Sequence, residues 1–285
     1  MLIVVKVGGS ILKEVPPEIV SDIKKIISDN QLILVHGGGK GVTEIAAKLG
    51  KEQKFVFSPT GFRSRYTDKE TMEIFTMVMA GRINKKLVSA LQKQEIPVVG
   101  LSGLDGFLLR ADRKKRLVIV NEKGRKQVID GGYTGKVNKV NDSLLSILLK
   151  NGFVPLVSPI AVSEEYEPLN VDADRTAANI AGALKADKLV LLTDVQGLML
   201  DGKLVHELSV EDIESKMKKI GGGMITKVYA AQEAIKHGVN EVIICSGIRK
   251  DPISSAIKHE NCTVITSEWK KDYWNWRKNN GADLC

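Results

Sequence analysis

Three glycine clusters in this chain have the neighbours expected of phosphate-binding turns. The pair at 8–9 closely follows Lys6, a run of three glycines follows His36, and a second run at 221–223 is followed by Lys227. Such turns let backbone N–H groups approach phosphate oxygens, and a following helix N-terminus adds a favourable dipole. One glycine turn is common, but three clusters, two of them beside a lysine, predict a phosphate site.

The two best-known nucleotide-binding signatures are absent. The chain contains neither GxxxxGK followed by Ser or Thr nor a GxGxxG that opens a helix. These patterns mark P-loop enzymes, dinucleotide-binding Rossmann proteins and protein kinases. The sequence therefore excludes these three classes, and its phosphate site must be built in another way.

Lys6 is unusual because it interrupts the apolar run 2–7 just before a glycine turn. A lysine in a buried parallel strand is costly unless an anion meets it. Its ammonium group could instead extend to solvent or pair with a carboxylate. We favour the interpretation that it reaches a phosphoryl group.

Further polar residues stand at the ends of predicted elements. The segment 170–174 (NVDAD) precedes a predicted helix, and Asp172 is expected to cap it. Asp174 and Asn170 are expected to face a cleft, where Asp174 would organise ammonium groups and Asn170 would bind a substrate. The segment 193–197 (TDVQG) either forms a plain Asx-turn or lies beneath a nucleotide.

Two arginines, Arg63 and Arg65, lie in a loop before a long predicted helix. Arginine is suited to bidentate recognition of carboxylates, so the loop predicts a carboxylate-binding site. The alternative is a solvated loop in which Thr67 or Asp68 caps the helix.

Apolar runs alternate with amphipathic stretches, which is typical of an α/β protein. Continuous apolar runs predict strands at 2–7, 31–35, 97–101, 154–157, 188–193 and 241–245. Helical spacing predicts helices at 17–28, 41–49, 69–94, 142–150, 173–184, 210–220 and 226–237. Two β-rich runs, 116–120 and 126–129, predict a hairpin.

These elements predict a three-layer αβα sandwich with a mainly parallel central sheet and two lobes. Charge and proline interrupt the pattern at 164–168, so we divide the chain into lobes of residues 1–164 and 165–285 on one continuous sheet. Ligands bind such sheets at the carboxyl ends of the strands. The glycine clusters fall at these ends.

The charge balance points to an anionic partner. The 285 residues carry 42 basic and 34 acidic side chains, a net charge of +8. Such a surface attracts nucleic acid, anionic phosphates or an acidic protein. The segment 110–126 holds eight basic residues against two acidic ones, so its hairpin is either solvated or a docking surface for something acidic.

The cysteines and histidines predict no metal site. The three cysteines are too few and too scattered for a disulfide framework, and His36 has no second histidine at metal-ligand spacing. The chain also shows no signal peptide and no membrane span. We therefore expect a structural His36, reduced thiols and a cytoplasmic protein. The tryptophans all lie after residue 268, and the sequence leaves open whether this tail caps the sheet or binds a partner: Trp269, Trp274 and Trp276.

Five motifs together resemble the amino acid kinase family, over nearly the whole chain. KVGGS, HGGG, NVDAD, LLTDVQG and GGGMITKV occur in the family's order, at 6–10, 36–39, 170–174, 191–197 and 221–228. Within the family they are similar to the acetylglutamate kinase branch. The loop at 61–67 is two residues longer, and the RYTD at 65–68 resembles a sister group. That group phosphorylates α-aminoadipate or glutamate attached to the C-terminus of a small acidic carrier protein.

The resemblance implies ATP-dependent phosphorylation of a side-chain carboxylate to an acyl phosphate, in lysine or arginine biosynthesis. It assigns the binding of the acyl substrate and the carrier to the N-terminal lobe and the binding of ATP to the C-terminal lobe. The implied catalytic residues are Lys6, Lys227 and Asp174. The implied substrate-binding residues are Gly38, Gly39, Arg63, Arg65 and Asn170. The implied ATP-binding residues are Gly8, Gly9, Ser10, Thr193, Asp194, Gly197, Leu198, Gly223 and Met224.

This chemistry needs no catalytic base, because a carboxylate with a pKa of about 4.3 is already ionised at neutral pH. One anion attacks another, so catalysis must rest on alignment and on cations around the transferred group. We expect Mg²⁺ to arrive with ATP and to be held mainly by its phosphates. The family implies a homodimer, and no nucleic acid or membrane partner is expected.

Two other functions remain open from the sequence. The chain could phosphorylate free N-acetylglutamate, or it could be a nucleotide-binding regulatory protein on the same fold. The longer arginine loop and the basic surface argue against the first. The presence of both Lys6 and Lys227 argues against the second.

Overall fold

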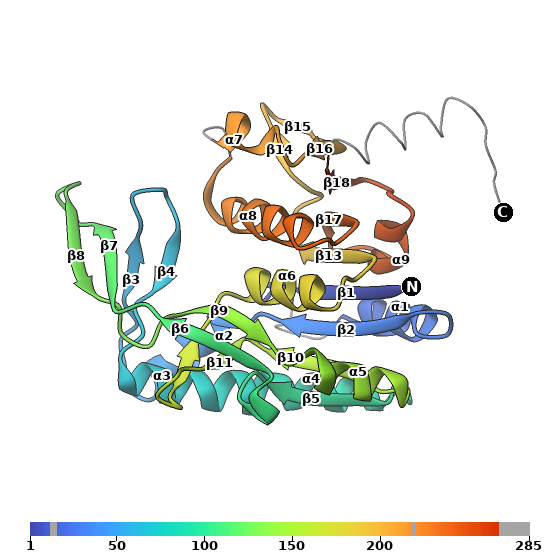
Figure 1. Ribbon diagram of the computed structural model, residues 1–285, viewed down its shortest axis with the longest axis horizontal. Coiled ribbons are helices and arrows are strands. Elements are labelled where there is room, and N and C mark those ends of the chain that lie inside the picture. The colour runs from blue at the N-terminus through green and yellow to red at the C-terminus, as the bar shows by residue number, and fades with distance from the viewer. Residues whose placement is uncertain (12–15, 218–219, 268–285) are drawn as a thin grey trace.

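The computed structural model describes residues 1–11, 16–217 and 220–267, and its centre is an eight-stranded sheet (Figure 1). The strands in spatial order are β16 (Glu207–Ser209), β18 (Cys262–Thr266), β17 (Glu241–Ser246), β13 (Lys188–Thr193), β1 (Leu2–Val7), β2 (Gln31–His36), β10 (Val154–Ser158) and β5 (Val98–Ser102). Every neighbouring pair is parallel except β17 and β18. The predicted mainly parallel sheet is confirmed.

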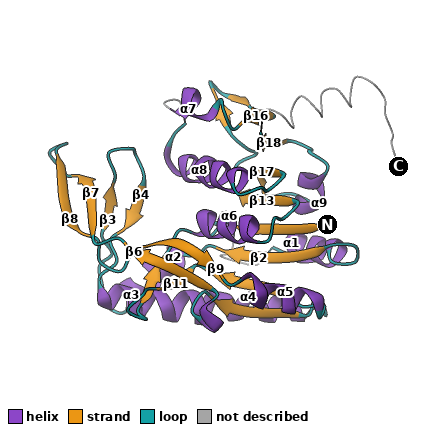
Figure 2. Ribbon diagram, viewed as in Figure 1, coloured by secondary structure: helices purple, strands orange, loops and turns teal. Residues whose placement is uncertain are grey.

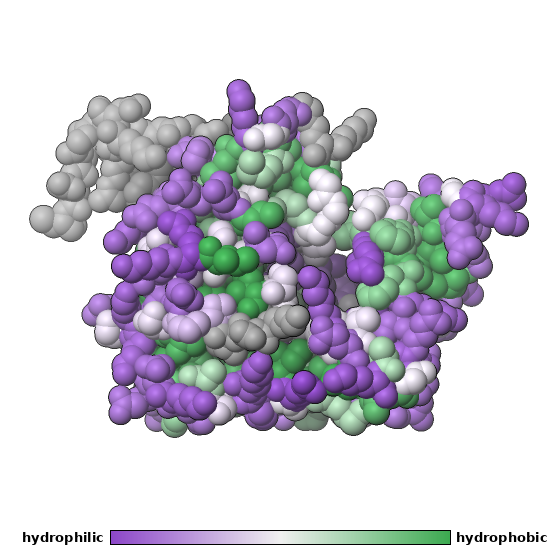
Figure 3. All heavy atoms as spheres, turned by 180° about the vertical axis from the view of Figure 1, so that it is seen from behind, coloured by the Kyte–Doolittle hydropathy of each residue, from purple (hydrophilic) through white to green (hydrophobic). Residues whose placement is uncertain are grey.

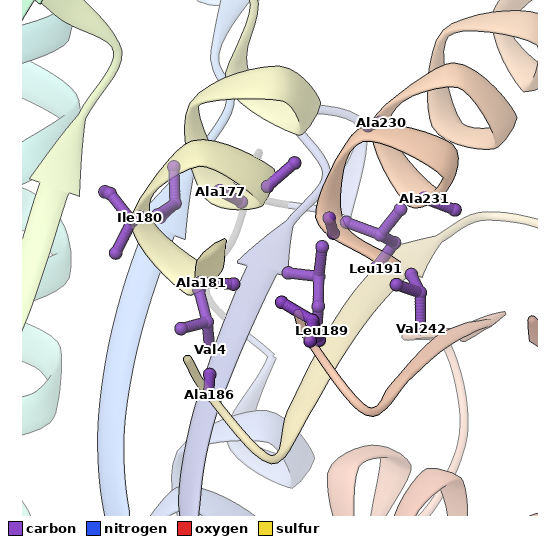
Figure 4. Close-up of a cluster of buried hydrophobic side chains, with 14 of the residues drawn as sticks. Val4, Ala177, Ile180, Ala181, Ala186, Leu189, Leu191, Ala230, Ala231 and Val242 are labelled. Carbon is purple, nitrogen blue, oxygen red and sulfur yellow. The ribbon is translucent and has the colours of Figure 1, made fainter. Parts of the chain in front are cut away.

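Helices cover both faces of this sheet, which makes three layers (Figure 2). One face packs against α5 (Asp142–Lys150), α6 (Ala173–Ala183) and α8 (Gly222–Lys236). The other packs against α1 (Pro17–Ile26), α4 (Asn84–Gln92) and α9 (Pro252–Ile257). Figure 4 shows how alanines of α6 and α8 lie against Val4, Leu189 and Leu191. Their small side chains bring both helices close to the sheet.

Strand β1 separates two groups of strands in the sheet. Strands that precede residue 164 lie on one side of β1, and strands that follow lie on the other. Because side chains alternate along a strand, Lys6 shares the face of Val4, toward α6. The segment 164–167 is the turn of a hairpin between β11 (Ile160–Val162) and β12 (Pro168–Asn170).

Two hairpins project from one end of the sheet and pair into a separate four-stranded sheet, the flap sheet (Figure 1). Its strands in order are β4 (Arg63–Arg65), β3 (Phe55–Phe57), β7 (Arg116–Val120) and β8 (Lys126–Asp130). The predicted β7–β8 hairpin is confirmed, whereas the sequence analysis did not foresee β3 and β4. Seen from behind in Figure 3, the tip of the flap sheet is hydrophilic and apolar residues gather nearer the body.

A small sheet and a short hairpin complete the strands. The small sheet has the order β12-β11-β6-β9, with β6 at Leu109–Arg113 and β9 at Gly135–Val140. The hairpin consists of β14 (Met199–Leu200) and β15 (Lys203–Leu204). Helix α2 (Gly39–Lys48) follows the second glycine cluster, and a 3-10 turn covers Asp105–Phe107.

The long helix predicted at 69–94 is present, but it is not uniform. Helix α3 (Lys69–Thr76) continues into a π-helical segment (Met77–Ile83) and then into α4. The helix predicted at 210–220 is shorter in the structure: among the described residues of this stretch, only α7 (Ile213–Lys216) is α-helical. The N–H of Val210 donates to Thr266 O and so prolongs strand pairing.

Three further findings bear on the sequence expectations. Helix α8 begins before the predicted residue 226, and β18 and α9 were not predicted. Within the described ranges, no helix is both long and apolar enough to cross a membrane. The tryptophan-rich tail lies outside the described residues.

Candidate active site

The carboxylate of Asp174 joins the two lysines on which the predicted chemistry depends. Lys6 Nζ lies 2.7 Å from Asp174 Oδ1, and Lys227 Nζ lies 2.9 Å from Asp174 Oδ2. Lys6 lies next to the last residue of the central strand β1, Asp174 lies in the first turn of α6, and Lys227 lies in α8. The fold thus gathers three charged side chains from distant parts of the chain.

Burial and charge act in opposite directions on Asp174. Burial raises the pKa of this carboxyl group, but the ammonium groups of Lys6 and Lys227 outweigh it and hold the pKa below its usual range. Asp174 is therefore ionised at neutral pH. It fixes both ammonium groups, whose remaining N–H donors are available to a second anion.

A pocket of about 470 Å³ opens beside this triad, which we call the small pocket. Its walls come from the turns after β1 and β13 and from the start of α8. All the residues predicted to bind ATP line it, together with Lys6 and Lys227: Gly8, Gly9, Ser10, Thr193, Asp194, Gly197, Leu198, Gly223 and Met224. The N–H of Gly8, however, donates to Leu192 O and is not free in this structure.

The loop below the small pocket is tied to the edge of the sheet. Leu198 N–H donates to Thr263 Oγ1 at 2.8 Å, and the Thr263 hydroxyl donates to Val205 O. Burial raises the pKa of Asp194, but hydrogen bonds from its own backbone N–H and from Thr193 and Ser10 outweigh this effect. The pKa of Asp194 is therefore lower than usual. Asp194 is therefore an anion at the border of this pocket.

A second and larger space of about 1280 Å³, the large pocket, runs between the flap sheet, α2 and β9. All the residues predicted to bind the substrate line it: Gly38, Gly39, Arg63, Arg65 and Asn170. Four residues line both pockets: Lys6, Gly9, Ser10 and Asp194. The two pockets therefore meet at Lys6, beside the Asp174 triad.

The wall at this meeting point is made by two glycine turns in direct contact. Gly37 N–H donates to Val7 O at 2.9 Å, and a Cβ on Gly9 would lie 2.6 Å from Gly38 N. A Cβ on Gly37 would lie 2.8 Å from Gly9 N. Any side chain at Gly9 or Gly37 would force the turns apart, so these positions require glycine.

Arg65 anchors the substrate side of the large pocket. Its guanidinium donates to Gly39 O at 2.7 Å, to Thr43 Oγ1 at 3.0 Å and to Gln53. Burial, and to a lesser degree the nearby charge of Arg63, lowers the pKa of Arg65 to about 10, so it stays cationic at neutral pH. Arg63 lies more exposed over the Phe55 ring, with 3.6 Å between Cζ and the ring centroid.

His36 is structural, as the sequence analysis expected. Burial lowers the pKa of His36 to about 4, so the ring is neutral. Asn84 Nδ2 donates to His36 Nε2, which leaves the Nδ1–H to donate to Gly37 O. Met79 and Ile83 of the π-helical segment lie against Gly38. This segment therefore supports the second glycine turn from behind.

Residues 1–246 match the amino acid kinase family. The chain belongs to the amino acid kinase family. Enzymes of this family transfer phosphate from ATP, so the chain is an ATP-dependent kinase. The family assignment agrees with the resemblance found from the motifs.

Curated relatives cover almost the full length of the chain. A LysW-aminoadipate/LysW-glutamate kinase of Sulfolobus acidocaldarius is 47% identical over 93% of this chain and 100% of its own. A relative from Cenarchaeum symbiosum, which carries the same name provisionally, is 58% identical over 93% of this chain and 99% of its own.

Solved structures of the family share the fold. The protein smu.665 of Streptococcus mutans superimposes with a TM-score of 0.77 at 25% identity, covering 94% of this chain and 99% of its own. An isopentenyl phosphate kinase superimposes with a TM-score of 0.62 at 20% identity, covering 93% of this chain and 100% of its own. The predicted amino acid kinase fold is thereby confirmed.

Several lining residues of this kinase were missed by the sequence analysis. Thr43 holds Arg65 and stands four residues after Gly39, on the same helix face, which was a usable signal. Lys114 and Lys136 line the large pocket. Lys114 belongs to the basic segment 110–126, which the sequence predicted only as a solvated hairpin or a docking surface. The place of both lysines in the pocket depends on how β6, β7 and β9 are assembled.

Proposed function

We propose that this kinase phosphorylates the side-chain carboxylate of α-aminoadipate or glutamate carried on an acidic amino-group carrier protein of the LysW type. The product is an acyl phosphate of lysine biosynthesis, with the glutamate reaction serving arginine biosynthesis. The observation that carries the proposal is the Asp174 triad at the junction of the two pockets. The names of the relatives at 43–58% identity support the choice of substrate.

The triad suits phosphoryl transfer between two anions. ATP phosphates would enter the small pocket, and the acyl carboxylate would enter the large pocket from the opposite side. Lys6 and Lys227 would neutralise the charge of the transferred group, with Asp174 holding both. N–H groups of Gly9, Gly38 and Gly39 make no backbone hydrogen bond within the described ranges and would assist. Because the carboxylate is already ionised, no base is needed.

On the substrate side, Arg65 would hold the carboxylate next to the amino group, and Asn170 and Arg63 would complete the site. The volume of about 1280 Å³ exceeds the roughly 300–1,000 Å³ of typical small-molecule sites. A free amino acid would leave most of it empty. The excess volume supports a substrate that brings part of a carrier with it.

The flap sheet offers the carrier a basic surface. Its exposed cations include Arg63 on β4 and a group along the β7–β8 hairpin: Lys115, Arg116, Lys123, Arg125 and Lys126. Arg113 is not part of this surface, because it pairs with Glu167 at 2.8 Å and stacks on Tyr133. Opposite charge would guide the acidic carrier to the mouth of the large pocket.

The remaining expectations are part of the same proposal. Mg²⁺ enters with ATP and is held mainly by phosphate oxygens. The N-terminal half, residues 1–164, serves the acyl substrate and the carrier, and residues 165–285 serve ATP. The kinase is cytoplasmic and forms a homodimer, which light scattering can test.

One experiment separates this function from its rivals. ADP release is measured with aminoadipate on LysW, with glutamate on LysW, and with free N-acetylglutamate. We expect rapid turnover with the LysW-bound substrates and little with the free one. Turnover of N-acetylglutamate alone would make the chain an acetylglutamate kinase. ATP binding without ADP release in any arm would make it a regulatory protein.

A further inference from the structure

The peptide bond between Gly37 and Gly38 is held from behind by a side chain. His36 Nδ1 lies 3.0 Å from Gly37 O. This peptide bond is trans, and in a planar trans peptide the C=O and the following N–H point in opposite directions. A hydrogen bond that fixes Gly37 O on the His36 ring therefore also fixes the direction of Gly38 N–H, which points away from the ring.

Asn84 decides which nitrogen of the His36 ring carries the proton. Asn84 Nδ2 lies 3.1 Å from Leu156 O and 3.3 Å from Leu101 O, and a carbonyl oxygen can only accept. The amide nitrogen must therefore face these two oxygens, and it also lies 3.3 Å from His36 Nε2. Because Nε2 is the acceptor, the proton is on Nδ1, where it donates to Gly37 O.

The buried Asn84 amide and His36 ring are kept at a cost in stability. Both side chains are fully buried, and burial lowers the pKa of His36 to about 4, so its ring is neutral. Asn84 Oδ1 has no hydrogen-bond partner among the residues that the structure describes, which costs roughly 1–3 kcal/mol. The structure thus leaves one buried acceptor unpaired, so Asn84 is present for its donors and not for packing.

Packing holds the glycine turn in place on both sides. A Cβ on Gly9 would lie 2.6 Å from Gly38 N, and a Cβ on Gly38 would clash with Met79 and Ile83 of the π-helical segment. Gly38 lines the large pocket, and its N–H has no backbone acceptor within residues 1–11, 16–217 and 220–267. This N–H is therefore available to a ligand.

These contacts do not by themselves fix the rotation of the Gly37–Gly38 peptide. Neither residue has a Cβ, so a flip that exchanges the directions of C=O and N–H meets little steric resistance. A flipped peptide would turn the Gly37 carbonyl oxygen toward an incoming anion and repel it. The hydrogen bond from His36 opposes this flip.

We propose that His36 is a positioning residue for phosphoryl transfer: it holds the Gly37–Gly38 peptide so that Gly38 N–H donates to the transferred phosphoryl group. This inference rests on the proposed function, because that function places the transferred group where the two pockets meet. A donor that is aimed before the reaction needs no reorganisation when charge develops on the transferred group. His36 thus acts on the reaction through the backbone, without touching the substrate.

The tautomer of His36 tests the first step in the wild-type protein. The chain has four histidines, and two-bond ¹H–¹⁵N spectra show which ring nitrogen of each carries the proton. The signals of His36 are those missing from the spectrum of His36→Asn. We expect the neutral Nδ1–H tautomer from about pH 8 to about pH 5, since the pKa is about 4. An Nε2–H tautomer would overturn the inference.

Two substitutions of His36 separate the aiming of the peptide from the filling of the core. Asn places an amide N–H near the position of Nδ1, whereas Gln places one near Nε2, so His36→Asn can still donate to Gly37 O. With aminoadipate on LysW, His36→Gln should lower kcat about tenfold or more and leave the KM of ATP unchanged. His36→Asn should recover most of the wild-type kcat. The matched control is His206→Gln at an exposed position. Equal losses in the Asn and Gln variants would contradict the inference.

A mimic of the transferred group gives the same comparison without turnover. ADP with Mg²⁺ is titrated by calorimetry with and without aluminium fluoride. We expect His36→Gln to bind the fluoride complex about tenfold more weakly and ADP alone as wild type does. Equal binding of the complex by wild type and His36→Gln would overturn the inference, as would no binding by wild type.

The outcomes for His36 and for the proposed function can be told apart. If the wild type does not turn over LysW-bound substrates, the proposed function fails, and the tautomer and the fluoride complex still decide the role of His36. Thermal unfolding checks that each variant is folded. If His36→Gln does not fold, the wild-type tautomer and the affinity of His36→Asn for the fluoride complex decide, and a tenfold loss in that variant would count against the inference.

Discussion

The small pocket and the large pocket meet at Lys6 but are built in different ways. The small pocket is lined by turns that follow strands of the central sheet, including glycines of the first and third clusters. The large pocket is closed by the flap sheet and is lined by charged side chains such as Arg63, Arg65 and Lys114. The small pocket suits a fixed group such as a triphosphate, and the large pocket suits a substrate read by its charges.

This difference makes the two sides separable by experiment. Changes at the junction should alter turnover, because the proposed mechanism places the transferred group there. Changes in one pocket should alter the KM of the substrate of that pocket only.

Lys227→Ala is expected to have the largest effect. Removing one of the two cations should lower kcat by about a hundredfold or more and leave the fold intact. Coupled measurement of ADP release gives kcat, and circular dichroism checks the fold. Lys236→Ala, at an exposed position of the same helix, is the control. Near-normal turnover of Lys227→Ala would remove this lysine from the mechanism.

His36 should impose a pH dependence on the stability of the junction. Its pKa is about 4 in the folded protein and about 6.5 in an unfolded chain, so the unfolded state binds the extra proton between these values. The buried neutral ring therefore contributes about 3 kcal/mol to the free energy of unfolding. This contribution is complete above pH 6.5 and is lost as the pH falls to 4. Urea unfolding from pH 7 to 4 should show this loss in wild type and not in His36→Asn.

The control for His36 is His206→Asn, which changes an exposed histidine. Its unfolding free energy should follow the wild-type curve with pH. Parallel curves for wild type and His36→Asn would mean that His36 is not held neutral behind the glycine turn.

Arg65→Lys should act on the large pocket alone. Lysine keeps the charge but cannot hold Gly39 O, Thr43 and a carboxylate at once as the planar guanidinium can. We expect KM for the LysW-bound substrate to rise roughly tenfold. KM for ATP should stay the same. An equal rise in both constants would show that the pockets are not independent.

Neutralising the tip of the flap sheet should have the smallest effect. Replacing Lys123, Arg125 and Lys126 by Gln should weaken LysW binding about fivefold at low salt and reduce its salt dependence. The control replaces three exposed lysines of the opposite half by Gln: Lys236, Lys250 and Lys258. Equal effects of the two triple variants would mean that only net charge matters and that the flap sheet is not the docking surface.

The sequence predicted the small pocket better than the large one, for a physical reason. Its residues lie in short turns directly after buried strands, and parallel topology brings such turns to one edge. The residues predicted to bind ATP therefore line one cavity, although the N–H of Gly8 already donates a hydrogen bond to Leu192 O. Thr263 was missed because the strand that carries it was not predicted.

The large pocket depends on pairings that no local pattern reveals. Residues 57 and 120 are partners across β3 and β7, more than sixty positions apart in the chain. The sequence predicted a carboxylate site in the arginine loop but did not predict that the loop is part of the flap sheet. Lys114 and Lys136 reach the pocket only through this assembly, so their positions could not be read from the sequence.

The π-helical segment Met77–Ile83 has a consequence for how this enzyme can change. Each residue advances an α-helix by about 100°, and the wider turn of the π-helical segment takes up one extra residue. An insertion or deletion in α3 has no such compensation, so it would rotate everything that follows and carry Asn84 away from His36 and Leu87 out of the core. Point substitutions on the solvent side of this helix are tolerable, whereas the number of residues between the arginine loop and Asn84 is fixed. Insertions and deletions in related enzymes should therefore avoid this stretch.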